Sequence, residues 1–233
     1  MNDIIRIAAI ALVIIVSLPL HEFAHAYVAH LNGDDTARRM GRMTVNPVAH
    51  FDPVGFIMLL VVGFGFAKPV PVNSFNFRRK SLGIFTVAVA GVIVNMLIAF
   101  LFTFVFYMLM TNINSISIVN RGLNELFWQF FYLMPIVNIT LFFFNLLPIF
   151  PLDGFRVVES FTRFNNRFVQ FMRRYGFFIL IGLMIWSFVV DMLIRNDILA
   201  PKLWYLDFLG YYLSKATNFV FSGFLKFFAW IFG

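Results

Sequence analysis

The sequence predicts an all-helical membrane protein that crosses the bilayer several times. Hydrophobic residues make up 61% of the 233 residues, charged residues make up only 12%, and the mean hydropathy is +0.86. Because a soluble domain is about 45–50% apolar and about 25% charged, this excess indicates that lipid surrounds much of the chain. Several apolar runs also reach the roughly 20 residues that a helix needs to span a bilayer.

The first two predicted spans cover residues 4–31 and 83–110. The first ends at Asn32-Gly33-Asp34-Asp35, which is a typical helix stop. The second carries Gly91 and Asn95, which lie four residues apart and therefore share one face of the helix.

The region between these spans, residues 36–82, mixes several kinds of segment. Residues 40–46 are compatible with a short strand, and the proline-rich segment 68–72 suggests an extended edge. Residues 54–67 are apolar but too short for an ordinary span, which favours a re-entrant or interfacial segment.

Two further spans are predicted at residues 125–147 and 175–194. The first of them is followed by Pro148 and Pro151, which no regular helix accommodates, so the backbone must break there. Residues 155–174 combine aromatic and basic residues, as an amphipathic surface helix does. The aromatic tail, residues 196–233, is compatible with either an interfacial or a transmembrane position.

Charge bias predicts the orientation in the membrane. Seven Lys or Arg residues fall within 31–82 and five within 148–175, whereas the loop 111–125 holds only Arg121. The positive-inside rule then places the N-terminus outside and the basic segments in the cytoplasm. This bias accounts for the net charge of +7 without nucleic acid as a partner, and the absence of cysteine excludes disulfides and thiolate ligands.

A zinc-hydrolase pattern, His21-Glu22-Phe23-Ala24-His25, lies within the first span. His21 and His25 share a helix face and can ligate one Zn²⁺, while Glu22 is placed to act as general base. The alternative is a chance match of the spacing. Ionisable residues in a span cost roughly 2.5–3.5 kcal/mol each on insertion scales, so packing explains three of them on one turn poorly.

A catalytic zinc site usually has three protein ligands, and four residues could supply the third. Asp153 is favoured because it follows the proline break, although it could instead cap the next helix. His30 faces roughly 140° away from His25 on the helix, which suits an interfacial histidine. His50 and Asp52 are more simply explained as hydrogen-bonding groups of a turn-rich loop.

Three motifs together resemble the site-2 protease family of intramembrane zinc metalloproteases, in particular its short bacterial members without a PDZ insertion. They are His21 to His25, Gly91-Val92-Ile93-Val94-Asn95, and the stretch from Asn145 to Gly154. The resemblance covers about residues 7–195, and Val92 departs from it because proline often stands there in the family.

The resemblance implies a three-helix catalytic core with zinc held by His21, His25 and Asp153 and with Glu22 as the catalytic acid/base. It also implies a small membrane-associated β region between the first two spans. Asn145 matches an asparagine thought to contact substrate, and we expect Asn95 to serve the substrate site as well.

The expected domain organisation is an intramembrane metalloprotease domain at 1–195 followed by the tail at 196–233. The expected activity is endopeptidase cleavage in or near transmembrane segments of other proteins, at the cytoplasmic side of a bacterial cell membrane. Whether the chain has a regulatory membrane partner or forms a homo-oligomer is left open. The alternatives are a metal-ion transporter that uses the His/Asp cluster as a transit site and a catalytically silent scaffold.

Overall fold

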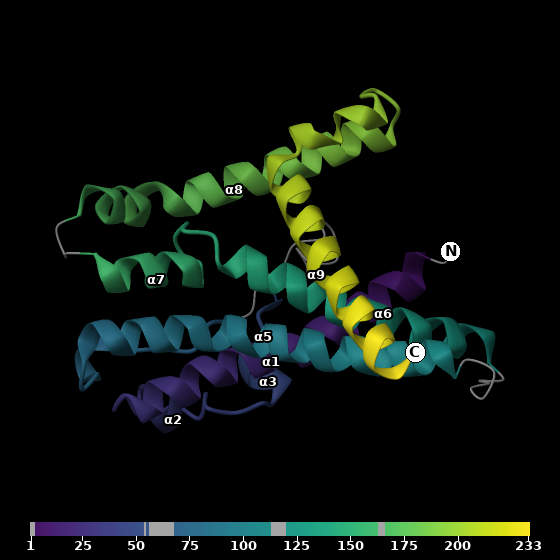
Figure 1. Cartoon of the computed structure of the whole chain (residues 1–233). Helices are drawn as coiled ribbons and strands as arrows, with labels where there is room; N and C mark the ends of the chain where they lie inside the picture. The colour runs from purple at the N-terminus through teal and green to yellow at the C-terminus, as the bar shows by residue number, and fades with distance from the viewer. Residues whose placement is uncertain (1–2, 54, 56–67, 113–119, 163–165) are drawn as a thin grey trace.

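The computed structural model describes residues 3–53, 55, 68–112, 120–162 and 166–233, and most of them are helical (Figure 1). The helices in chain order are α1 (Asp3–Leu31), α2 (Thr36–Arg39), α3 (Pro47–His50), η1 (Ser74–Asn76), α5 (Lys80–Thr111), α6 (Arg121–Asn145), α7 (Asp153–Phe161), α8 (Arg167–Arg195), η3 (Pro201–Leu206) and α9 (Phe208–Phe232). By length and composition α1, α5, α6 and α8 are able to cross a bilayer. These four helices confirm the four predicted spans.

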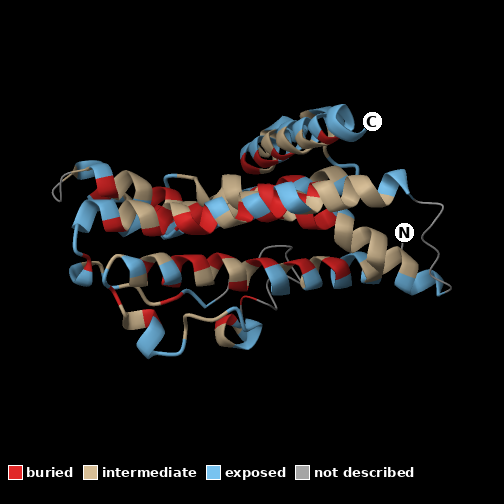
Figure 2. Cartoon of the chain, turned by 60° about the horizontal axis from the view of Figure 1, so that its bottom comes forward, coloured by how far each residue is buried: buried red, intermediate tan, exposed pale blue. Residues whose placement is uncertain are grey.

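The core of the protein is the bundle formed by α1, α5 and α6, which pack against one another along their lengths. Small residues line the contact, including Ala9 on α1 and Ala88 and Ala99 on α5, all fully buried. Small side chains let helix backbones approach closely, which is the main source of packing energy where lipid surrounds the helices. Figure 2 shows the buried residues as stripes on the inner faces of these helices.

The predicted break after α6 is confirmed. The helix ends at Asn145, and α7 begins at Asp153 and packs on α5. Protein covers the break, because a Cβ placed on Gly176 of α8 would lie 2.9 Å from the Phe150 backbone nitrogen. A non-helical backbone at membrane depth requires such cover.

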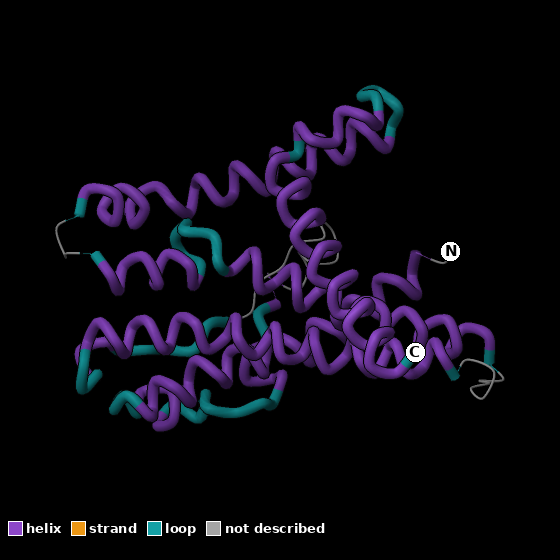
Figure 3. The backbone as a smooth tube through the Cα atoms, viewed as in Figure 1, coloured by secondary structure: helices purple, strands orange, loops and turns teal. Residues whose placement is uncertain are grey.

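The small β region predicted between the first two spans is not supported. No strand is present in the described residues, including the parts of 36–82 that the structure describes (Figure 3). Residues 40–46 form turns, while the re-entrant segment predicted at 54–67 lies outside the described residues apart from Gly55.

The segment 68–73 is extended, but its backbone groups bond to side chains and to the His50 carbonyl instead of to a second strand. Pro69 and Pro71 have no N–H to offer. The Arg42 guanidinium donates to the carbonyl oxygens of Lys68 and Pro69, at 2.7 and 3.2 Å. These bonds use backbone groups through which a second strand would pair.

The fourth span begins earlier than predicted, at Arg167 and not at residue 175. The Asn166 side chain accepts hydrogen bonds from the backbone N–H groups of Phe168 and Val169 and so starts the helix there. The amphipathic helix predicted at 155–174 is therefore divided between α7 and the first turns of α8.

The aromatic tail forms α9, which crosses α5 and α6 in Figure 1. Phe228 of α9 packs against Phe100 and Phe104 of α5, and the hydroxyls of Thr140 and Thr217 lie 3.0 Å apart. The helix is thus joined to the core, while the division into domains at residue 195 stays a prediction.

Asp34, which follows α1, anchors the segment that leads to α5. Its carboxylate accepts hydrogen bonds from the backbone N–H of Asn73 at 2.7 Å and the side-chain amide of Asn76 at 2.8 Å. Thr36 donates to it from both its backbone and its hydroxyl. Burial by itself would raise the pKa of Asp34, but these hydrogen bonds outweigh it and hold that pKa below the ordinary value.

Replacing Asp34 is expected to destabilise the protein, because Asp34→Ala strands buried donors. We expect the free energy of unfolding to fall by about 2–3 kcal/mol. Since the folded-state pKa is lowered, the contribution of Asp34 is present above its unfolded pKa and is lost as the pH falls through the folded value. Thermal unfolding in detergent measures both effects.

The matched control is Asp35→Ala. Asp35 is partly exposed and pairs with His30, so its loss is expected to change stability by about 1 kcal/mol at most. Equal melting temperatures for the two variants would show that Asp34 is no anchor.

Candidate active site

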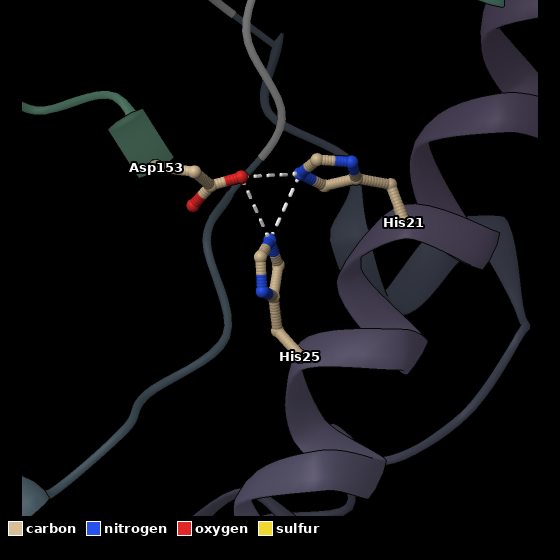
Figure 4. A group of neighbouring side chains, drawn as sticks. All are labelled: His21, His25 and Asp153. Atoms are coloured by element: carbon tan, nitrogen blue, oxygen red, sulfur yellow. Dashed lines mark hydrogen bonds and ion pairs between the residues drawn. The ribbon is translucent and has the colours of Figure 1, made fainter. Parts of the chain in front are cut away.

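Three side chains that the sequence singled out converge at one point inside the bundle (Figure 4). His21 and His25 extend from successive turns of α1, and Asp153 extends from the first residue of α7. The two Nε2 atoms lie 2.9 Å apart, and each is 3.2 Å from Asp153 Oδ2. His21 and His25 are buried, and Asp153 is nearly so.

This cluster fits a zinc ion. Tetrahedral Zn²⁺ with bonds of about 2.0–2.1 Å holds its ligand atoms about 3.3 Å apart, close to the observed separations. Two imidazoles and a carboxylate are also a donor set of catalytic zinc sites, which leave a fourth position open. Within the part of the chain that the structure describes, it is the one group of three such residues able to hold a metal.

Asp153 has the geometry of a ligand and not of a helix cap. Leu152 occupies the N-cap position of α7, and no side chain caps this helix end. The Asp153 carboxylate instead points across to α1. Its place in the first turn also suits a negative charge, since the N-terminus of a helix carries partial positive charge.

His25 is oriented by a group that the sequence did not reveal. Its Nδ1 lies 2.7 Å from the carbonyl oxygen of Val87 on α5, to which it donates. This bond fixes the tautomer that leaves Nε2 free to bind metal. No residue type marks a backbone carbonyl in a sequence, so only the helix packing exposes it.

Gly91 on α5 makes room for the ligands. A Cβ at this position would lie 2.4 Å from His25 Nε2 and 2.5 Å from His21 Cε1. Any side chain there would collide with the imidazoles. A glycine inside an apolar span was the signal available in the sequence.

Glu22 lies partly buried beside the first ligand, where its carboxylate meets the extended segment 68–73. Its Oε2 accepts a hydrogen bond from the backbone N–H of Val70 at 2.8 Å. This bond holds the side chain in one orientation.

The other candidate ligands lie elsewhere and have partners of their own. His30 pairs with Asp35 at 2.6 Å, His50 Nε2 lies 2.8 Å from the Thr44 carbonyl oxygen, and Asp52 accepts from the Gly55 N–H. These contacts agree with the hydrogen-bonding roles that the sequence offered for His50 and Asp52.

The two asparagines assigned to the substrate are placed differently. Asn145 is the last residue of α6 and is partly buried, next to the break. Asn95 is fully buried inside the bundle. Contact of either residue with substrate stays a prediction.

The model of Peptidase family M50 matches residues 9–183, a stretch that contains all three proposed ligands and the four membrane-length helices up to most of α8.

The chain belongs to peptidase family M50.

This M50 peptidase has named relatives in bacteria. YwhC of Bacillus subtilis, named as a candidate zinc metalloprotease, is 42% identical over 152 residues, which are 65% of this chain and 68% of YwhC. Rip2 of Mycolicibacterium smegmatis, named in the same way, is 27% identical, over 73% of this chain and 64% of Rip2. Rip2 of Mycobacterium tuberculosis is 29% identical, and the match spans only 55% of it. No solved structure matches the chain.

Membership of this family confirms the resemblance found in the sequence and makes the chain a zinc metalloprotease of the membrane. A metal-ion transporter finds no support, because the relatives carry the names of proteases. The His-His-Asp cluster supplies the expected place for the zinc ion.

Replacing Gly91 in this M50 peptidase is expected to expel the metal. In Gly91→Ala the added methyl collides with both imidazoles, so zinc affinity should fall by about tenfold or more. Zinc content of the purified protein after gel filtration measures this loss. The control is Gly182→Ala on α8, where nothing lies within 4 Å of the added Cβ. Full zinc content in Gly91→Ala would contradict the proposed crowding.

Proposed function

We propose that the chain is a zinc-dependent intramembrane endopeptidase in which His21, His25 and Asp153 hold the metal and Glu22 is the catalytic acid/base. It would cleave peptide bonds in or near transmembrane segments of other membrane proteins. The observation that carries the proposal is the convergence of these three ligands, from α1 and α7, inside a bundle of membrane-length helices.

The chemistry follows from the side chains around the cluster. Zinc, when bound, acts as a Lewis acid that acidifies water and polarises the scissile carbonyl. The Glu22 carboxylate accepts the proton of the attacking water and returns it to the leaving amine. The Val70 N–H that bonds Glu22 Oε2 holds the carboxylate in place for both transfers.

Asn145 is the proposed substrate-contacting residue. It ends α6 just before the proline break, and an amide N–H there can donate to a carbonyl oxygen as negative charge develops on it. Its partial exposure leaves the amide accessible beside the break.

Charge bias supports a proposed site near the cytoplasmic side. The basic residues flanking α5 and α7 favour a cytoplasmic position for those helix ends, and His21 and His25 lie in the half of α1 nearer to the same side. Substrate selection by a regulatory membrane partner or by a homo-oligomer stays a prediction.

Glu22→Gln separates metal binding from catalysis. The variant should keep one zinc per chain, because the amide leaves the ligands untouched, and should lose about 100-fold or more of the cleavage rate. Membrane proteomics of a deletion strain complemented with wild type or Glu22→Gln identifies the cleaved proteins. Asp153→Ala is the control and should lose both zinc and cleavage. Cleavage at the wild-type rate by Glu22→Gln would contradict the proposed mechanism.

The orientation can be tested with single cysteines, because the chain has none of its own. In intact cells a membrane-impermeant maleimide should label Arg121→Cys, at the exposed start of α6, from outside. Arg39→Cys, at the exposed end of α2, should be labelled only after lysis. The reverse pattern would contradict the proposed orientation.

A further inference from the structure

The two histidines of the cluster differ in what holds the far side of each ring. His25 Nδ1 donates to the Val87 carbonyl, whereas His21 Nδ1 is buried and has no hydrogen-bond partner in the described residues. A histidine that binds metal through Nε2 carries its proton on Nδ1, and that N–H almost always donates to a fixed acceptor. His21 therefore needs an acceptor that its own helix does not supply.

The helix facing His21 is α5, which runs antiparallel to α1. Successive turns of the two helices lie side by side. His25 is level with Val87, to which it is hydrogen-bonded. One turn further along, His21 lies against Gly91, where a Cβ would be 2.7 Å from His21 Nδ1.

The same register brings Ser17 of α1 level with Asn95 of α5. The turn after that is apolar, and Val13 and Ile98 belong to one buried cluster, in agreement with this register. Asn95 therefore lies one turn beyond Gly91, at the level of Ser17.

The helix register and one hydrogen bond bring three buried polar side chains to this level. Ser17, Asn95 and Asn138 are all fully buried, and the Asn138 amide donates to Ser17 Oγ at 2.8 Å. Both Oδ1 and Nδ2 of Asn95, and Oδ1 of Asn138, have no partner among the described residues. Buried amides without partners are costly in an apolar core and are satisfied in proteins by enclosed water.

The spacing suits one water molecule between Asn95 and His21. One helical turn along α5, from Gly91 to Asn95, is a rise of about 6 Å, and side chains on a helix lean toward its N-terminus, which directs the Asn95 amide back toward Gly91 and His21. Two hydrogen bonds of about 2.8–3.0 Å that meet at the tetrahedral angle of a water span about 4.5–5 Å, which suits the shorter gap left between the two side chains. The water could also donate to or accept from the free amide atoms at this level.

We propose that Asn95 is a positioning residue: an enclosed water accepts a hydrogen bond from His21 Nδ1–H and donates one to Asn95 Oδ1, with Ser17 and Asn138 holding that water in place. The inference rests on the proposed metal site. It gives His21 the counterpart of the bond that Val87 makes to His25. It also assigns Asn95 to the metal ligand and not to the substrate, in keeping with its full burial.

The test measures metal binding directly. Purified protein in detergent is titrated with Zn²⁺ against a chromophoric chelator, and the visible spectrum of the Co²⁺-loaded protein reports the ligand geometry. Asn95→Leu, which keeps the volume and removes both polar atoms, should weaken zinc binding about 10–100-fold and shift the Co²⁺ bands. The control Thr103→Val removes a buried hydroxyl two turns further along α5, bonded to Ala99, and should leave both readouts unchanged.

A second pair of variants guards against misfolding of Asn95→Leu. Asn95→Ser and Asn95→Ala open the same space and differ in one hydroxyl. The serine variant should bind zinc about tenfold tighter than the alanine variant, because the hydroxyl can again anchor the water. Equal affinities in this pair, or wild-type affinity and spectrum in Asn95→Leu, would overturn the proposal for Asn95 alone. A wild-type protein that binds no zinc would overturn the metal site as well.

Discussion

The structure depends on one constraint: ionisable side chains buried among apolar helices must interact with one another. Two imidazoles and a carboxylate lie inside a bundle of membrane-length helices, where an unpaired charge is expensive. They become tolerable because they share one point, with a spacing that suits a zinc ion. This requirement explains why the chain leaves α6 through a proline-broken segment: the break lets α7 start with Asp153 directed at α1.

Close helix packing makes that arrangement possible. Small residues on α1 and α5 let the two backbones approach closely. Gly91 leaves the imidazoles the space that a side chain at this position would fill. The same closeness puts the Val87 carbonyl within reach of His25. Helix packing therefore sets the geometry of the proposed metal centre. Substitutions at these small residues are expected to alter that geometry.

The segment before α5 links the loop region to the proposed general base, Glu22. Asp34 fixes it at Asn73 and Asn76, Arg42 fixes it at Lys68 and Pro69, and between these points the Val70 N–H meets Glu22. Side chains of α1 and of the loop after it thus bond backbone groups through which a second strand would pair. The proposed general base is thus oriented by residues well outside the helix that carries it.

The sequence by itself determined the membrane class, the four spans and the three proposed ligands. An apolar run and a His-Glu-x-x-His spacing can be interpreted from local helix geometry alone. The prolines before Asp153 predict a helix break by themselves. The sequence was wrong about the small β region between the first two spans, because extended character does not say which groups will pair. It also placed the start of α8 too late, because the cap at Asn166 outweighed the polar composition after it. Tertiary structure alone decided that the Val87 carbonyl, Gly91 and the Val70 N–H lie beside the proposed site. Each acts through a neighbour more than 40 residues away along the chain, and such contacts arise only when the helices pack in a definite register.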